Sequence, residues 1–493
     1  MEFPAKGSKG GRFPRLCLRD SIRDDDPSVQ RLLRVLEDAD SLTTLLLAAW
    51  QVARVLAVHM VEAVLAARAR RPTAWPPCPV CGTSLRSKGF AQRQLTSLLG
   101  PIHWRRCVGR CPHGCDIPQV APLDAALGVQ PHQRTSGELQ CLGCALAVFV
   151  PLATAARLLG WYCGGVVSPR AVWGGVQAAG PQAMEGLHAD LAAGAQGHEP
   201  TPEPLAAEQA AWPLALGADG VMVPFRPEGG TPRGKLRWRE IKVGVLARLG
   251  QHCTRTGQLV TRLHQRRLVA VLGDIEALTP RLWLEAVRQG IRSAAQVVWL
   301  SDGGRGWWRR DEERFAGHAR GILDFYHAVQ QLWRGAAAWL DGRTPQARRW
   351  FGWARHRLRH GMPDGVLADL REALDVEGWP ETARETLRTV YAYLHRHREH
   401  IHYDMYKDLG LPLGSGMVES ACKWLIQQRF KGVGMRWSED GFKHLLHLRL
   451  AWGNGRFEAL FGLTLSPEPV TAPVSPTFAV RWRWCTAQLT VDT

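Results

Sequence analysis

The feature that most constrains the fold is a change from helical to strand patterning at Pro213. Two segments after it, PLALGADGVMVPFR and WREIKVGVLARL, are short apolar runs with β-branched residues and intervening glycine or proline, a pattern typical of a β-hairpin. A third segment, QVVWLSD, is apolar throughout, which favours an interior strand. Helical patterning then fills residues 307–406, and a helix is predicted from Met417 to Phe430 after the turn GLPLGSG. This order predicts an α/β fold in which a helical insertion separates the strands from the last helix.

Three carboxylates lie at the ends of these predicted elements. Asp219 follows an apolar strand segment, Asp302 closes the run VVWLSD, and Glu419 lies just inside the helix after the glycine-rich turn. Burying such groups is costly unless cations or hydrogen-bond donors are near. Hard oxygen ligands suit Mg²⁺, so the three acids together predict a divalent-metal site. Singly, each acid also fits a structural role, because aspartate is common in turns and glutamate near a helix start complements the helix dipole.

Four stretches carry a family resemblance: ADGVMVPFR, WREIKVGVL, LDFYHAVQQLW and GSGMVESACKWLIQQRFKGVGMRW. They resemble segments of the ISKra-type bacterial insertion-sequence transposases, relatives of the mutator-like group, and the resemblance spans roughly residues 78–461. It implies an RNase H-like catalytic domain whose Asp-Asp-Glu (DDE) triad is Asp219, Asp302 and Glu419, separated by 83 and 117 residues. The implied activity is DNA cleavage with Mg²⁺ or Mn²⁺, followed by joining of the 3′-hydroxyl to target DNA. The sequence DGGRGWW departs from the family, in which an alanine and an aromatic-rich run follow the second aspartate.

The segment from Asp324 to His327 is also similar to an Asp-x-x-His element of the mutator-like group. On a helix the two side chains share a face, so Asp324 could orient the His327 imidazole. The resemblance places His327 near the scissile phosphate or a displaced base, which makes it a catalytic candidate. The alternative is a helix start that packs against the sheet.

A cysteine-rich, turn-rich stretch over residues 76–124 predicts a zinc ribbon, because a Cys-x-x-Cys pair is followed by a second pair about 30 residues on. Cys107 or His113 could replace one member of the second pair, and free thiols in a loop are the alternative. Cys141 and Cys144 share the spacing but lie in an apolar helical run, which favours the core. The predicted tetrahedral Zn²⁺ ligands are Cys78, Cys81, Cys111 and Cys115.

The net charge of +17, with a pI near 9.8, favours an acidic polymer as partner. In the last predicted helix, Lys423 shares a face with Glu419 and Gln427, one turn from the predicted metal ligand. Cations and a tryptophan follow in a glycine-interrupted stretch that fits phosphate contacts and base stacking; a solvated basic surface is the alternative. The predicted DNA-binding residues in this part of the chain are Lys423, Arg429, Lys431, Arg436 and Trp437.

Residues 152–179 predict a pair of helices similar to a helix-turn-helix. Ser168 can cap the second helix, with Pro169 at its first position. Arg170 and Gln177 could then face a DNA groove. Plain helical packing explains the pattern equally well.

The long apolar segment over residues 42–67 carries its polar residues, Gln51, Arg54, His59 and Glu62, on one side of a helix. This pattern predicts a helix that is buried or packs on a partner, and argues against a membrane span. The first residues lack the apolar core of a secretory signal, so the cysteines are expected in the reducing cytoplasm, with the protein at the nucleoid.

The expected partner is double-stranded DNA, both transposon ends and target, bound by a homodimer or larger homo-oligomer. An RNase H-fold nuclease that cleaves without joining, or a non-enzymatic zinc-ribbon DNA-binding regulator, would also fit these residues. An intact acidic triad argues against the regulator. The predicted modules are a basic arm and helical region (1–75), the zinc ribbon (76–124), a helical DNA-binding region (125–200), the RNase H-like core (201–306 and 411–462), the helical insertion (307–410) and a proline-rich tail (463–493).

Overall fold

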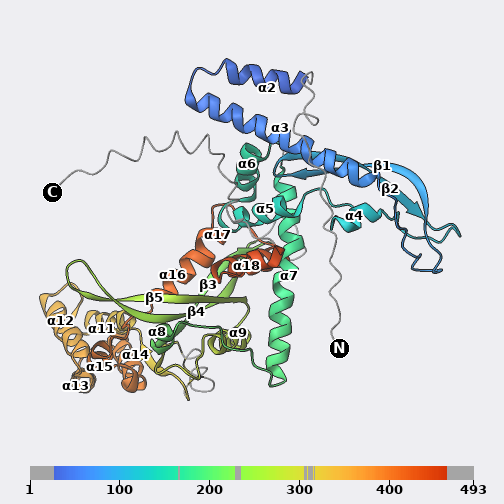
Figure 1. Ribbon diagram of the computed structural model, residues 1–493. Coiled ribbons are helices and arrows are strands. Elements are labelled where there is room, and N and C mark those ends of the chain that lie inside the picture. Colours follow the sequence, from blue (N-terminus) through green and yellow to red (C-terminus); the bar gives the residue numbers. More distant parts are fainter. Residues whose placement is uncertain are drawn as a thin grey trace, which may run out of the picture.

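The computed structural model describes residues 27–164, 167–227, 235–304, 308, 315 and 317–462, and Figure 1 shows how their helices and strands are arranged. The predicted basic arm up to residue 26, Arg305 in the loop that departs from the family, and the predicted tail from residue 463 lie outside the described residues.

A five-stranded mixed sheet forms the centre of the molecule, in the order β5-β4-β3-β6-β7. β3, β4 and β5 are antiparallel neighbours, whereas β6 pairs in parallel with both β3 and β7. β6 is buried along its whole length, which confirms the prediction of an interior strand. The strands are Leu214–Phe225 (β3), Arg237–Cys253 (β4), Leu259–Leu272 (β5), Val297–Ser301 (β6) and Arg320–Leu323 (β7).

Two of these strands are missing from the sequence prediction. β5 is an edge strand whose first half is mostly exposed and rich in arginine and histidine, so it lacks the apolar run that marks the other strands. β7 has only four residues and lies inside the stretch predicted to be helical. The helical prediction is therefore wrong for residues 320–323, where pairing with β6 decides the conformation.

A long β-hairpin and several helices precede the sheet, and Figure 1 shows the hairpin projecting away from it. Leu65 of helix α3 packs with Leu95, Ile102 and Trp104 of the hairpin in a small core of its own. These elements are α2 (Pro27–Glu37), α3 (Leu42–Ala69), β1 (Arg86–Ser97), β2 (Gly100–Arg110), α4 (Pro122–Ala126), α5 (Gly137–Phe149), α6 (Leu152–Cys163), α7 (Pro169–Ala195) and α8 (Ala207–Ala211).

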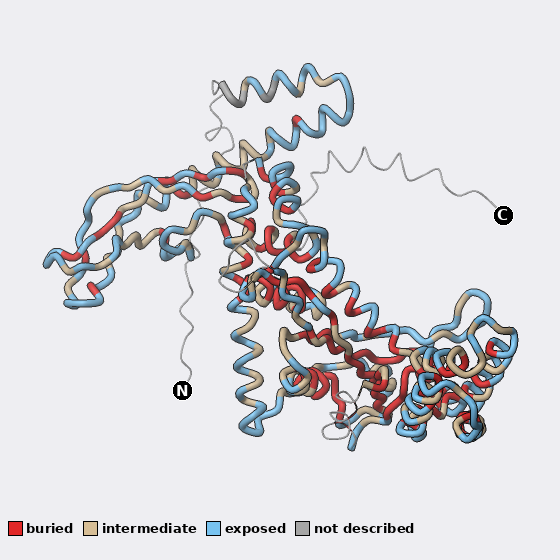
Figure 2. Tube along the Cα trace, turned by 180° about the vertical axis from the view of Figure 1, so that it is seen from behind, coloured by how far each residue is buried: buried red, intermediate tan, exposed pale blue. Residues whose placement is uncertain are grey.

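Helix α3 is largely uncovered, so the first of its two expected roles, burial in the core, is wrong, and packing on a partner stays a prediction. Only Ala48 and Leu65 are buried in it, and Figure 2 shows most of the first half of α3 exposed. Its polar side reaches the rest of the molecule, because Arg54 donates to the Tyr162 carbonyl (3.3 Å) and Glu62 accepts from the His103 N–H (2.8 Å). By length and a hydropathy of 1.6 over its most apolar window, α3 could cross a membrane, but those two properties do not distinguish a span from a partner-packing helix.

The sheet is the middle of three layers. A Cβ on Gly217 of β3 would lie 2.6 Å from Val418, and one on Gly244 of β4 would lie 2.8 Å from Leu282. Gly217 pairs with Val245, the residue after Gly244, so the two glycines point to opposite faces. Helices therefore approach closely on both sides, those around α16 on one face and α9 on the other.

The predicted helical insertion lies between β7 and α16, at one end of the sheet (Figure 1). Leu387 and Val390 of α14 are buried in it, in contact with the main core. The helices that follow β5 are α9 (Ile275–Arg288), α11 (Phe325–Leu340), α12 (Pro345–Arg359), α13 (Pro363–Asp375), α14 (Glu381–Arg396), η3 (Arg398–His400), α15 (Tyr403–Asp408), α16 (Gly416–Ala421), η4 (Cys422–Gln427), α17 (Gln428–Phe430), α18 (Glu439–Gly453) and η5 (Glu458–Phe461).

Candidate functional site

Strand register places two of the predicted acids side by side. β3 and β6 pair in parallel up to Gly217 and Leu300, an offset of 83 residues that equals the separation of Asp219 and Asp302. Continuing this register by two residues sets Asp302 beside Asp219, with both side chains on one face. Asp219 does not end its strand, as the sequence suggested, because β3 pairs with β4 as far as Phe225. The two acids lie where β6 stops and β3 continues.

The third acid comes from a helix that lies over the same face. Gly217 and Asp219 are two residues apart in β3, so they point to the same side of the sheet. Because glycine has no Cβ, α16 can rest with Val418 directly on Gly217. Glu419, the next residue, is exposed. Burial, and then the charges of Asp219 and Glu419, raise the pKa of the Cys422 thiol to about 12, so both carboxylates lie near this buried thiol.

Burial and the neighbouring Asp302 charge disfavour the ionised form of Asp219. Burial raises the pKa of Asp219 and the Asp302 carboxylate raises it further, although the Gly220 N–H, which donates to Asp219 at 2.6 Å, lowers it. A cation between the acids would remove the repulsion. The carboxylate oxygens do not converge as tightly as bound ligands, since within the described residues a group of four cysteines is the only set of potential ligand atoms all within 4.8 Å of one another.

Asp324 joins three elements at this end of the sheet. It follows β7 directly, and its backbone N–H donates to Ser301 at the end of β6 (2.8 Å). Its carboxylate accepts from the His327 N–H (2.9 Å), which caps α11, and from the Ser415 hydroxyl (2.6 Å). Burial alone would raise the pKa of Asp324, but the donors from His327 and Ser415 hold it well below its ordinary range. Because Ser415 precedes α16, this buried carboxylate fixes the helix of Glu419 against the strand ends.

The His327 imidazole lies near the same acids. Its Nδ1 is 3.2 Å from Asp324 Oδ1, and the side chain is half-buried. The contact with Asp324 raises the pKa of His327 despite burial, and the charges of Asp302 and Glu419 raise it further. The structure therefore brings His327 close to the predicted triad, in an environment that favours its protonated form.

The helical insertion supports the loop that follows Asp302. The Gly304 N–H donates to the Asp302 carboxylate (3.0 Å), and the Tyr393 hydroxyl of α14 donates to the Asp302 carbonyl (2.8 Å). Gly303 has a φ of +88°, and a Cβ there would lie 2.6 Å from the Tyr393 ring. Gly303 thus lets α14 approach the backbone of Asp302.

The helix after Glu419 is not regular. It widens into the π-helical turn η4, so Gln427 does not repeat the four-residue spacing that was expected to align it with Lys423. Buried Arg449 of α18 donates from Nε to the Leu425 carbonyl (2.9 Å) and from Nη2 to the Trp424 carbonyl, both in this turn. The guanidinium therefore satisfies backbone oxygens within the widened turn.

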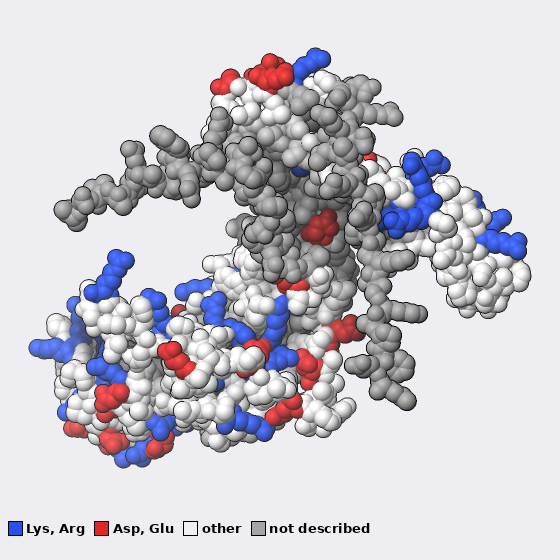
Figure 3. Space-filling view, viewed as in Figure 1, with Lys and Arg blue, Asp and Glu red and all other residues white. Residues whose placement is uncertain are grey.

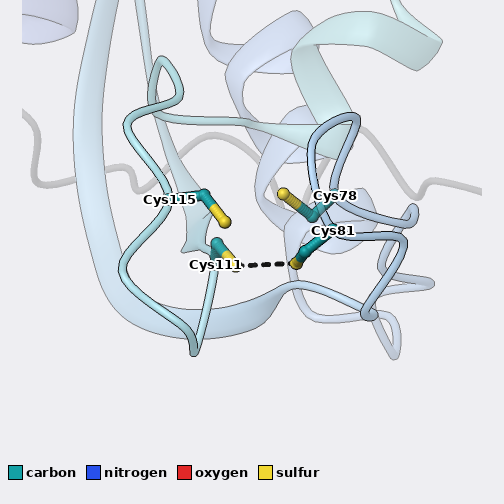
Figure 4. Close-up of side chains that lie close together, drawn as sticks. All are labelled: Cys78, Cys81, Cys111 and Cys115. Atoms are coloured by element: carbon teal, nitrogen blue, oxygen red, sulfur yellow. Dashed lines mark hydrogen bonds between the residues drawn. The ribbon is translucent and has the colours of Figure 1, made fainter.

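The four predicted zinc ligands converge at the far end of the hairpin (Figure 4). All four sulfurs lie within 4.8 Å of one another, and those of Cys81 and Cys111 are 3.4 Å apart. Hydrogen bonds from the backbone and hydroxyl of Thr83 lower the pKa of Cys81 to about 5, which favours a thiolate. Four sulfur ligands at this spacing fit a closed tetrahedral site for a metal such as zinc.

The alternative ligands lie outside this cluster. Cys107 contacts Ser87 within the hairpin (3.1 Å), and His113 approaches Thr83 (3.5 Å). Cys141 and Cys144 have no exposed surface, which confirms that they belong to the core.

Three of the predicted DNA-binding side chains are engaged in packing. Arg429 is 2% exposed and donates to the Ala147 carbonyl (2.7 Å), so it is not a solvated cation. Trp437 is 9% exposed, and its indole N–H donates to the Phe430 carbonyl (3.0 Å). Gln177 contacts His444 between α7 and α18 (2.8 Å), which contradicts a groove-facing position. Local patterning could not reveal the partners of Arg429 and Gln177, which lie 282 and 267 residues away in the sequence.

Four other predicted DNA-binding side chains are exposed: Lys423, Lys431, Arg436 and Arg170. The two expected helices are confirmed as α6 and α7, and the Ser168 hydroxyl caps α7 by accepting from the Ala171 N–H (3.1 Å).

No protein-family model and no curated protein matches this chain. Among solved structures, it is similar to a Drosophila P element transposase strand transfer complex, with a TM-score of 0.24 and 10% identity, over 68% of this chain and 83% of that chain. Similarity at that TM-score carries no argument about fold or function.

A basic surface on the hairpin is absent from the sequence prediction. Figure 3 shows Lys and Arg side chains gathered along it, and the Arg105 guanidinium lies 5.6 Å from the centre of the exposed Phe90 ring. The alternation of exposed and less exposed positions in β1 and the first half of β2 would have been the signal for a hairpin in place of the turn-rich loop that was expected. The exposed cations are Arg86, Lys88, Arg105 and Arg110.

Proposed function

We propose that this chain is a DDE transposase in which Asp219, Asp302 and Glu419 hold Mg²⁺ or Mn²⁺ within an RNase H-like domain. The observation that carries the proposal is the parallel register that sets Asp302 beside Asp219, under the helix of Glu419. The resemblance of the segments around the three acids to ISKra-type transposases supports it. Three antiparallel strands followed by two parallel ones are compatible with the RNase H-like fold.

The acids suit a divalent cation by their chemistry. They offer hard oxygen ligands, and the raised pKa of Asp219 reflects a charge that lacks compensation. Cations bound there would activate the attacking oxygen and stabilise the leaving one. Lys423, exposed one turn after Glu419, would contact a DNA phosphate, and His327 would hold a proton beside the scissile group.

The remaining modules would hold DNA. Zn²⁺ at the four cysteines would rigidify the end of the hairpin. The exposed cations of the hairpin would contact DNA phosphates. The proposal places the protein at the nucleoid in the cytoplasm, on transposon ends and target DNA, as a homodimer or larger homo-oligomer.

The test combines cleavage and joining on duplexes taken from the DNA that flanks the gene. Asp219→Asn, Asp302→Asn and Glu419→Gln are each expected to reduce cleavage by at least about 10³-fold with Mg²⁺ present, while duplex affinity changes little. The exposed Glu377→Gln in the helical insertion is the control for loss of one charge. Substantial cleavage by any of the three variants contradicts the triad. Cleavage by the wild type without strand-transfer products would instead identify a nuclease.

A further inference from the structure

A basic pocket lies between the start of α7 and the segment that follows the last helix of the proposed catalytic site. Its volume is about 480 Å³. Arginines from four separate parts of the chain line it, and no acidic side chain does so in the described part of the protein. The residues that carry the argument are Arg170, Arg226, Arg429, Arg436, Trp173 and Trp437.

The walls of this pocket are fixed by the fold. The Arg226 N–H donates to the Trp437 carbonyl (2.9 Å), and the Trp437 N–H donates to the Pro224 carbonyl (3.3 Å), so the segment around Trp437 extends the end of β3. Trp173 packs on Gly441 at the start of α18. Arg170 lies in the first turn of the 27-residue helix α7, whose dipole favours an anion, although Pro169 has no N–H and the Ala171 N–H is capped by Ser168.

A buried cation lines the pocket without a matching acid. Arg429 is 2% exposed, and its Nη2 has no hydrogen-bond partner, although its Nε donates to the Ala147 carbonyl. Burial lowers its pKa to about 10, so the guanidinium remains charged at neutral pH. A buried guanidinium with a vacant donor among three other arginines is a feature of an anion site.

The pocket is larger than a phosphate group requires. Its volume falls in the range of sites that enclose small organic ligands, roughly 300 to 1,000 Å³. The half-buried Trp173 ring in the same wall supplies aromatic surface for a base, whereas the Trp437 ring is covered by Phe430 and Arg429.

We propose that this pocket binds a single DNA nucleotide turned out of the base stack, with its phosphate at the arginines and its base against Trp173. The inference rests on the proposed function, because it makes DNA the ligand. Asp219 and Phe225 are six residues apart in β3, so the pocket lies about 20 Å from the acids at roughly 3.3 Å per residue. That distance corresponds to about six base pairs of duplex from the cleavage point, at about 3.4 Å each.

The experiment uses the full-length protein with the Asp302→Asn substitution and no added divalent cation, so that cleavage plays no part. One duplex carries an unpaired 2-aminopurine about six positions from the cleavage point, and its partner is fully paired. We expect tighter binding of the duplex with the unpaired base, together with quenching of its fluorescence by stacking. Arg170→Ala and Arg226→Ala, both at exposed positions, should each weaken that binding by about tenfold and abolish the preference.

Arg255→Ala, at the exposed turn after β4, removes the same charge away from the pocket and should leave the preference intact. Equal losses on both duplexes, without quenching, would show that the pocket holds an ordinary backbone phosphate and overturn the nucleotide proposal. No loss in either pocket variant would overturn the site altogether. A wrong proposed function would give a different result from both of these. The wild-type protein would then not cleave DNA in the separate cleavage test, whichever duplex it prefers to bind.

Discussion

At the scale of single residues, Asp324 links most directly to the candidate site. Its buried carboxylate accepts from His327 and Ser415, and so fixes the start of α11 and the start of α16 at once. The imidazole and the helix of Glu419 therefore share one anchor that carries no proposed metal ligand role. Substitution there should disturb the geometry of the acids while all three remain in the chain.

We expect Asp324→Asn to lower the pKa of His327 and to cost about 3 kcal/mol of folding free energy, because a buried, hydrogen-bonded charge is lost. The lowered pKa of Asp324 contributes stability above about pH 3.8, which is lost as pH falls through that lowered value. The raised pKa of His327 contributes stability below about pH 6.5, which is lost as pH rises through that raised value. The wild-type advantage should therefore be largest between these two pH values. NMR titration of the imidazole and denaturation across pH measure both effects, and an unchanged His327 pKa would contradict the proposed anchoring.

The sequence predicts the surroundings of the acids and of the Asp-x-x-His pair better than it predicts which cations are exposed. Strand ends and helix starts can be read locally, which is why Asp302, Glu419 and His327 lie near where they were expected. The burial of Arg429 depends on the Ala147 carbonyl, 282 residues away, and no local pattern encodes that contact. Asp219 does not lie at the predicted strand end for a similar reason. Pairing with β4 extends β3 beyond Asp219 as far as Phe225.

At the scale of elements, the widened turn η4 depends on a residue from another helix. Arg449 donates to two carbonyls of η4 and to Val148, so it ties α18, η4 and the end of α5 together. The sequence predicts a regular helix here, because a π-helical turn stabilised by a distant guanidinium has no local pattern.

Arg449→Met should reduce the free energy of unfolding by about 2 to 3 kcal/mol, since buried carbonyls lose their donors. Hydrogen exchange should also rise in Cys422–Gln427. Lys443→Met, on the same helix, removes a cation that pairs with the half-exposed Glu439 and should cost about 0.5 kcal/mol or less. Equal effects of the two substitutions in chemical denaturation would show that Arg449 does not support η4.

The four-cysteine cluster is the feature that the sequence predicts best, because two close pairs of cysteines are recognisable by their spacing alone. The long hairpin between the two cysteine pairs was not predicted, because the whole stretch was interpreted as turn-rich and the alternation within it was not recognised. Gly82 and Gly114, with φ values of +70° and +72°, allow the tight turns that bring each cysteine pair back on itself.

Purified protein is expected to contain about one Zn²⁺ per chain by elemental analysis, and Cys78→Ser should remove most of it. Cys107→Ser, whose sulfur lies in the hairpin outside the cluster, should keep the metal. Chelation should increase hydrogen exchange around the four cysteines while β3 and β6 stay protected, because the cluster has only a small core of its own. Zinc-free protein with an unchanged exchange pattern would rule out a structural metal there.

At the scale of the whole molecule, the net charge is +17, and exposed cations lie on two separate surfaces. The hairpin carries exposed cations at one end, and Lys431 lies beyond the last helix of the candidate site, 5.8 Å from the Trp238 ring. A DNA segment that touched both would neutralise phosphates on each, with release of counterions.

Duplex affinity should therefore fall log-linearly with salt. Arg105→Ala and Lys431→Ala are each expected to reduce the slope by about 0.9, the value for one lost phosphate contact. Arg388→Ala, on an exposed face of the helical insertion where it pairs with Glu381, should leave the slope unchanged. Binding isotherms at several salt concentrations measure the slopes. If Lys431→Ala behaves like Arg388→Ala, the basic segment after Phe430 does not lie on the DNA path.

The helical insertion also sets the order in which the acids become available during synthesis. Asp219 and Asp302 can pair as soon as β3 and β6 have left the ribosome, but Glu419 is made 117 residues after Asp302. At roughly 5 to 20 residues per second, that interval is about 6 to 23 s. Arg449, which supports the helix of Glu419, follows later still. A nascent or prematurely ended chain therefore holds two acids without the third, and the complete set exists only once nearly the whole protein has been made.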